Sequence, residues 1–185
     1  YVVSRSAQQA AAGLKTFVFA SAADAQKLDP ADVTDAESIK VLSNVCEGLV
    51  RFKSGTTQVE PCLAESWSIS ADGCLAIFAI REGVKFHDGT PLTPETAAWS
   101  CRRQMDAAAP GHFPGASFVY WPALYGDIEE VRPLDGQRLQ MRLKRPNAAL
   151  LASLAIFPAF LISPKSLADH GEGLQRHPVG TGPFK

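Results

Sequence analysis

The spacing of hydrophobic and polar residues predicts a chain of short strands interrupted by a few short helices. The first apolar run, T-F-V-F-A-S at 16–21, is rich in β-branched and aromatic residues and predicts a buried strand. A loop over 22–30 follows and closes on Leu28-Asp29-Pro30. Proline has no N–H to donate and restricts the residue before it, so the strand cannot extend to this point.

A helix is predicted over 35–48. Its apolar residues recur at steps of three and four, which places them on one helix face: Ile39, Leu42, Val45 and Leu49. Asp35 is the expected N-cap, because its short side chain can accept hydrogen bonds from the free N–H groups of the first turn. Gly48 is the expected C-terminal stop.

The middle of the chain predicts antiparallel strands. A hairpin is expected from the segments 49–52 and 58–60. A further strand at 65–70 turns at Asp72-Gly73 into a strand at 74–81. This last segment is apolar at nearly every position, so both of its faces are expected to be buried.

The second half of the chain predicts a helix over 93–106, with Thr93 as its cap. The segment 107–122 is expected to be irregular, because prolines and glycines interrupt it, and it carries several aromatic residues. A hairpin is then expected from 128–133 and 138–144. Apolar and polar residues alternate in its second strand, so one face should lie in the core.

The last elements expected are a short helix at 148–155, a strand at 156–162 and a helix that opens at Ser163-Pro164. The order of strands and helices is therefore mixed and does not repeat a βαβ unit. This predicts an α/β protein of the α+β class, or one with a mixed sheet, rather than a doubly wound fold.

Composition and charge exclude several classes of protein. Apolar residues make up 46% of the chain, charged residues 20%, and the net charge is −1, so no basic surface for nucleic acid is expected. The longest apolar stretch, 148–162, is interrupted and too short to span a bilayer. The segment 7–13 either resembles the small-residue end of a processed export signal or is a flexible, alanine-rich terminus. No intact signal peptide is visible in the sequence.

The cysteines do not form a recognisable metal or redox motif, because no C-x-x-C is present. An even number of cysteines would permit disulfides in an oxidising compartment. Each of them also lies among apolar residues, which favours small buried side chains without disulfides. The four residues are Cys46, Cys62, Cys74 and Cys101.

No catalytic motif stands out. The glycine-rich phosphate loops and the G-x-S-x-G motif of serine hydrolases are absent. Cys101 lies beside two arginines that could lower its pKa, but its helical position favours an inward-facing side chain. The four histidines are scattered, so no metal site is expected. The sequence therefore predicts neither an enzyme nor a cofactor.

The stretch R-E-G-V-K-F-H-D-G-T-P at 81–91 gathers many charged side chains, yet its pattern is typical of a turn. Asp88 can accept a hydrogen bond from the backbone two residues later, and the glycine after it tolerates positive φ. We interpret the stretch as a strand, a kink and a turn into the capped helix. Its charged side chains are expected to face solvent.

This stretch is part of a segment that resembles the peptide/nickel class, family 5, of extracellular solute-binding proteins of ABC transporters. The segment is D-G-C-L-A-I-F-A-I-R-E-G-V-K-F-H-D-G-T-P-L-T-P-E at 72–95. Three further segments agree in order: L-D-P at 28–30 before a helix that ends in V-C-E-G-L-V at 45–50, P-C-L-A-E-S-W at 61–67, and P-V-G-T-G-P-F-K at 178–185. Cys46 and Thr96-Ala97 depart from the family pattern.

The resemblance implies a periplasmic-binding-protein-like fold of type II, of which the chain would hold a part. Residues 1–46 would start the first ligand-binding lobe, 47–165 would form an extra α+β subdomain, and 166–185 would return toward the first lobe. The second lobe would be absent. Because a ligand is held between two closing lobes, such a chain is expected to bind weakly, and its open sheet edges are expected to promote self-association.

The resemblance also implies where a ligand could be contacted. In the family, the loop after the first strand faces the ligand cleft, and aromatic residues after the second long helix reach it in some members. Asp24 could instead cap a turn, and the aromatic residues could instead pack against the prolines of their own loop. The candidates are Ser21, Ala22, Ala23 and Asp24 in the first loop, and Tyr120 and Trp121 in the second.

The function that the resemblance implies is capture of a peptide or similar small solute and its delivery to the permease subunits of an ABC importer. The expected location is periplasmic or extracytoplasmic, as a lipid-anchored or a soluble protein. Three alternatives stay open on sequence grounds: a sensor domain of the same fold, a truncated product without a transport role, and a small enzyme on an unrelated fold. The ligand itself is not specified by these motifs.

Overall fold

The structure, a computed structural model, describes residues 21, 23–113, 116 and 118–185. The strand predicted at 16–21 therefore lies, except for Ser21, outside the described residues. The helices and strands are, in chain order, α1 (Ala36–Val45), β1 (Val50–Phe52), β2 (Val59–Pro61), β3 (Ala64–Ile69), β4 (Leu75–Ile80), α2 (Pro94–Met105), the π-helix η2 (Trp121–Tyr125), β5 (Ile128–Pro133), β6 (Arg138–Leu143), α3 (Leu150–Leu154), the 3₁₀-helix η3 (Phe157–Ala159), α4 (Pro164–His170) and the 3₁₀-helix η4 (Gly171–Arg176).

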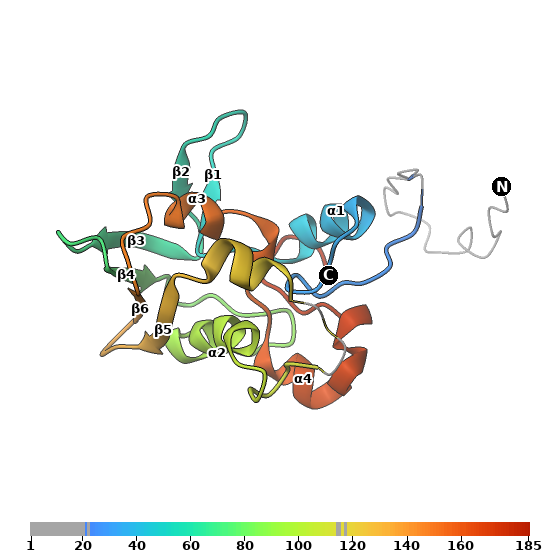
Figure 1. The fold of residues 1–185 in the computed structure, drawn as a ribbon. Coiled ribbons are helices and arrows are strands. Elements are labelled where there is room, and N and C mark those ends of the chain that lie inside the picture. The colour runs from blue at the N-terminus through green and yellow to red at the C-terminus, as the bar shows by residue number, and fades with distance from the viewer. Residues whose placement is uncertain (1–20, 22, 114–115, 117) are drawn as a thin grey trace, which may run out of the picture.

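The strands form two separate sheets. Four of them make an antiparallel sheet in the order β3-β4-β6-β5, and β1 pairs with β2 in a hairpin that projects from the body of the molecule (Figure 1). All these pairings are antiparallel, so the α+β prediction is confirmed and the described strands contain no mixed sheet. Both predicted hairpins are present.

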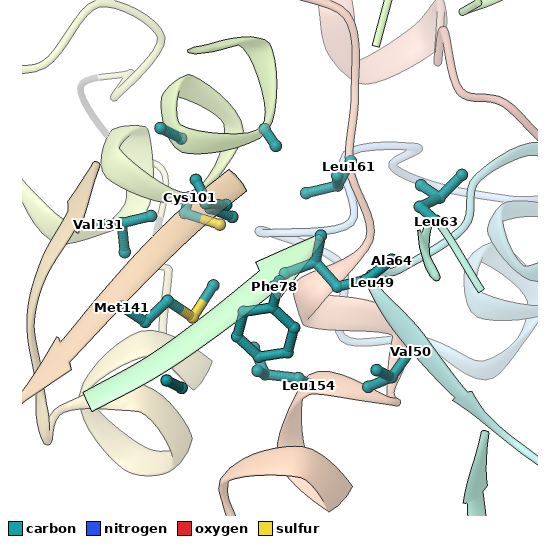
Figure 2. Close-up of a cluster of buried hydrophobic side chains, with 14 of the residues drawn as sticks. Leu49, Val50, Leu63, Ala64, Phe78, Cys101, Val131, Met141, Leu154 and Leu161 are labelled. Atoms are coloured by element: carbon teal, nitrogen blue, oxygen red, sulfur yellow. The ribbon is translucent and has the colours of Figure 1, made fainter. Parts of the chain in front are cut away.

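The main hydrophobic core lies between the four-stranded sheet and α2. Phe78 of β4 and Met141 of β6 are completely buried, and Cys101 of α2 belongs to the same cluster (Figure 2). Burying one such large apolar side chain stabilises the fold by roughly 1.5–3 kcal/mol. The predicted alternation in β6 is confirmed except at one position: Leu139, Met141 and Leu143 are buried and both arginines are exposed, but Gln140 is buried as well.

A second, smaller core surrounds α1. It unites side chains from four separate parts of the chain, and its buried residues are Val33, Leu42, Val45, Cys46, Phe113, Ile162 and Leu174. The predicted apolar face of the helix is therefore largely correct. Asp35 caps the helix as expected, since its side chain accepts the Ser38 N–H at 2.8 Å.

Two predictions about local structure were wrong. α1 ends at Val45, because Cys46 is already extended, and Gly48 lies beyond it in a tight passage against the Leu154 carbonyl. The strand expected at 156–162 is replaced by η3. Pro158 has no N–H for a sheet ladder, and only Leu161 pairs, in an isolated bridge to Glu47.

The strand β4 is also less buried than its composition suggested. Every second residue is buried, whereas Leu75, Ile77 and Ala79 keep part of their surface exposed. Their cross-strand partners on this face are polar: Leu75 pairs with the exposed Arg142, and Ile77 pairs with Gln140, which is itself buried. An antiparallel sheet can leave one face to solvent in this way, which an apolar run alone cannot reveal.

A buried ion pair joins the two cores. Arg103 of α2 makes a bidentate pair with Asp29, and their side chains are 1% and 0% exposed. Asp29 also accepts the Ala31 N–H at 3.0 Å, and Arg103 donates to the Gly111 carbonyl at 3.3 Å and lies over the Phe118 ring. The pair therefore fastens the loop before α1 to the helix that covers the main sheet.

Replacing Arg103 by methionine should destabilise the chain by about 3–5 kcal/mol, because it leaves the Asp29 carboxylate buried without its partner. The free energy of unfolding from urea denaturation measures this loss. Replacing Asp29 by leucine as well should cost less than the sum of the two single losses. Arg138→Met, which removes an exposed ion pair with Asp135, is the matched control and should leave the unfolding midpoint nearly unchanged. Equal effects of Arg103→Met and Arg138→Met would contradict the role of the buried pair.

Candidate functional site

A shallow groove of about 730 Å³ runs along the outer face of α1. Ser21, Ala23, Asp24 and Ala25 line it beside the helix, and so does Phe184 near the end of the chain. Val41 and Phe184 expose 39% and 62% of their surface here, so the groove offers apolar area as well as polar groups. Three of the predicted site residues line it: Ser21, Ala23 and Asp24.

The polar side chains of the groove are held by short local contacts. The Ser21 hydroxyl donates to Glu37, and Lys40 donates to the other oxygen of the same carboxylate at 2.8 Å. The hydrogen bond from Lys40, and then that from Ser21, lowers the pKa of Glu37. Asp24 accepts the Ala25 N–H at 2.9 Å, a hydrogen bond within its own segment.

The segment that carries these residues is fixed to α1 by its backbone. The N–H groups of Gln26 and Lys27 both donate to the buried Ser38 hydroxyl, at 2.9 and 3.2 Å. The Leu28 N–H then donates to the Gln175 carbonyl in η4 at 2.7 Å. A helix side chain and a distant loop therefore set the path of the candidate segment.

The predicted aromatic residues lie elsewhere. Trp121 is 9% exposed, belongs to the main core, and has its ring 5.2 Å from that of Tyr125. Tyr120 is half-buried, with its ring edge-on to Phe157 at 5.1 Å. Neither residue lines the groove. Ala22, the remaining predicted site residue, lies outside the described residues.

The groove residues that sequence reasoning missed include Glu37, Lys40, Val41 and Phe184. The first two could have been found from their spacing, because residues three apart share a face of a helix and α1 buries its other face. The exposure of Val41 and Phe184 depends on the packing of the whole chain and has no local signal.

The motifs behind the family resemblance meet next to this groove. The Gly182 N–H donates to the Val45 carbonyl at 2.9 Å, and the Phe184 N–H donates to the Asn44 carbonyl at 3.2 Å. The segment 182–184 therefore runs along the end of α1, with its backbone hydrogen-bonded to the backbone of the helix. A Cβ on Gly180 would stand 2.1 Å from the Val45 carbonyl oxygen, so only glycine fits there.

The stretch 81–91 holds the same segment from its other side. The His87 N–H donates to the Gly180 carbonyl at 3.0 Å, and its ring Nε2 lies 2.7 Å from the Gly182 carbonyl oxygen. Nε2 therefore carries the proton and donates, since a carbonyl can only accept. The predicted turn is confirmed, but the expectation that its charged side chains all face solvent was wrong for His87.

Asp88 of this turn also faces inward. It accepts hydrogen bonds from the Ser163 hydroxyl at 2.6 Å and from the Thr90 N–H at 2.9 Å. Burial opposes ionisation of this carboxyl, but the bonds from Ser163 and Thr90 outweigh it and lower the pKa of Asp88. The carboxylate ties the turn to the start of α4, which is a structural task.

The cysteines are free thiols in the structure. Burial raises the pKa of Cys46 and of Cys101 to about 12, and burial, with the nearby Glu47 carboxylate, raises that of Cys62 to about 11. The two arginines beside Cys101 only partly offset the effect of burial. Cys74 is partly exposed.

Within the described ranges, no group of three or more His, Cys, Asp or Glu side chains could hold a metal ion. The same residues contain no helix with the length and apolar character needed to cross a membrane.

Comparison with known proteins connects this fold to one family. The family model for bacterial extracellular solute-binding proteins, family 5 (middle), matches residues 58–185. The chain is 35% identical over 187 residues to heme-binding protein A of Haemophilus influenzae, covering 91% of this chain and 34% of that protein. It is 36% identical over 191 residues to the dipeptide-binding protein of Escherichia coli, covering 92% of this chain and 35% of that protein.

A solved structure agrees with the sequence matches. The periplasmic binding protein DppA of Helicobacter pylori, in complex with the peptide STSA, superposes with a TM-score of 0.81 and 37% identity. The alignment covers 88% of this chain and 35% of DppA. The chain thus spans about a third of the length of the relatives that it matches.

Replacing Gly180 by alanine should destabilise the chain by about 1–3 kcal/mol, because the new methyl group would overlap the backbone of Val45 and Cys46. Urea denaturation measures the change. Gly173→Ala is the matched control, because a Cβ there would have its nearest neighbour at 3.8 Å. The control should be unchanged or slightly more stable, and a similar loss in both variants would contradict the close approach.

In the folded chain, Cys46 and Cys101 should resist alkylation, because their raised pKa keeps the thiols protonated at neutral pH and their burial excludes the reagent. Cys74 should react first. Iodoacetamide labelling followed by peptide mass spectrometry measures the order, and addition of denaturant should make all four thiols reactive. Labelling of Cys101 as fast as Cys74 before unfolding would revive a nucleophilic role for it.

Proposed function

This chain belongs to family 5 of the bacterial extracellular solute-binding proteins, and from that premise we propose that it contributes to peptide capture for an ABC importer. The observation that carries the proposal is the agreement in fold and sequence with a binding protein solved in complex with a peptide. The proposed role is non-catalytic, extracytoplasmic binding of a peptide or similar solute and its delivery to permease subunits.

We propose the same division of the chain as the resemblance implies. Residues 1–46 would begin a ligand-binding lobe, 47–165 would form the extra subdomain, and 166–185 would return to the lobe. The two hydrophobic cores support this division, because the main core draws on residues from Leu49 to Leu161. The core around α1 receives Leu174 from the returning segment. Phe113 and Ile162 cross from the subdomain into this second core, so the two parts pack directly together.

The proposed ligand contacts are at the segment 21–24. Ser21, Ala23 and Asp24 are exposed, while the residues after them are anchored to Ser38 and to η4. An exposed backbone on a fixed support suits recognition of a peptide in strand fashion. Of the aromatic pair, Tyr120 keeps more accessible surface than Trp121, so it is the stronger of the two proposed contacts.

Self-association also remains a proposal. β3 is at one edge of the four-stranded sheet, and Ile69 at its end exposes 46% of its surface. An unpaired edge of this kind can accept another strand.

The ligand class can be tested by NMR titration of the ¹⁵N-labelled chain with di- to pentapeptides. The amide signals of Ser21, Ala23 and Asp24 should shift. The dissociation constant should be about 1 mM or weaker, because a shallow groove encloses only one side of a ligand. Free amino acids and haem at the same concentrations should leave these signals unchanged.

Asp24→Ala should reduce the peptide-induced shifts, whereas Asp135→Ala, an equally exposed carboxylate in the distant β5–β6 turn, should not. Shifts confined to other parts of the chain would reject the proposed contacts but keep the proposed ligand class. A folded chain that responds to no peptide would contradict the proposed function itself.

A further inference from the structure

The end of α4 brings two histidine side chains together at the surface. The rings of His170 and His177 are stacked, with centroids 4.5 Å apart and planes inclined by 20°. Both residues are exposed. They do not line the groove along α1, and none of the family motifs includes His170.

The backbone between them is closed into a fixed loop. α4 ends where Gly171 adopts a φ of 53°, which reverses the chain into η4. Leu174 in the middle of the loop is completely buried in the core around α1. The Ser166 hydroxyl donates to the His177 carbonyl at 3.1 Å. The two imidazoles are therefore brought together by the fold rather than by the flexibility of a surface loop.

We infer that His170 and His177 form a two-imidazole site for a borderline divalent transition metal such as Ni²⁺, Zn²⁺ or Cu²⁺. Neutral imidazole is a preferred ligand for these ions. The nitrogen lone pairs lie in the planes of the rings, so each ring must rotate out of the stack to chelate. That rotation is open to both side chains because they are exposed. Water completes the coordination.

The charges near the pair set a moderate affinity. Arg176 lies one residue before His177 and opposes a cation, whereas Asp169 next to His170 is already paired with Lys165. Glu172 in the loop is exposed, and among the described residues it forms no ion pair. Two imidazoles without a third fixed ligand bind more weakly than a closed four-ligand site.

A bound ion would act as a clip across the loop 171–176. Because the Gln175 carbonyl of this loop accepts the Leu28 N–H at 2.7 Å, the clip would also stabilise the support of the segment 21–24. Metal that binds only the folded chain raises its thermal midpoint by mass action. The inference does not depend on which solute the protein binds.

Calorimetry of the tag-free chain with NiCl₂ and with ZnCl₂ at neutral pH tests the site. We expect one ion per chain, and His170→Ala and His177→Ala should each weaken binding by at least about tenfold. Arg176→Gln, a change in the same loop, should retain binding. Unchanged binding in both histidine variants, or no binding in the parent chain, would overturn the inference.

Two further measurements keep the test decisive if an alanine variant unfolds. His170→Asn and His177→Gln keep polar side chains, and their circular dichroism and thermal midpoint without metal report whether the loop still folds. Substoichiometric Cu²⁺ should broaden the amide signals of residues 166–178 in the parent chain but not in these variants. Broadening centred on another part of the chain would place the site elsewhere and reject the histidine pair.

Discussion

The buried pair between Asp29 and Arg103 is the contact on which the arrangement of the described chain most depends. Two charges taken out of water cost several kcal/mol each, and they are tolerated only when each satisfies the other with good geometry. Here the carboxylate and the guanidinium meet bidentately, with Phe118 over the guanidinium. Because the partners come from the loop before α1 and from α2, the two hydrophobic cores must meet in one orientation for both charges to be paired.

The same junction explains why the most recognisable motifs of the chain are structural. Gly180 and Gly182 approach the end of α1 so closely that a side chain would overlap its backbone. His87 donates to this returning segment, and Asp88 of the same turn holds the start of α4 through Ser163. The motifs therefore identify the family, because they build the joint between its parts, but they say little about the ligand.

The candidate site was only partly within reach of sequence reasoning. Ser21, Ala23 and Asp24 do line one groove, since they lie close together in sequence and the backbone that follows them is bonded to Ser38. Trp121 was grouped with them through the resemblance alone, and its ring is packed in the main core instead. Glu37 and Lys40 were missed for a different reason. Their spacing predicts that they share one face of a helix, but it does not predict that this face lines a groove.

The sequence by itself determined the local elements and the family. Helix caps at Asp35 and Thr93, the turn residues and the alternation in β6 act over a few residues, so their effect is visible in the pattern. Tertiary structure decided where α1 ends, that 156–162 is not a strand, and that β4 leaves one face partly open. It also decided that Asp29 finds Arg103 and that His170 stacks on His177. These outcomes depend on contacts between distant parts of the chain, which no local pattern of residues encodes.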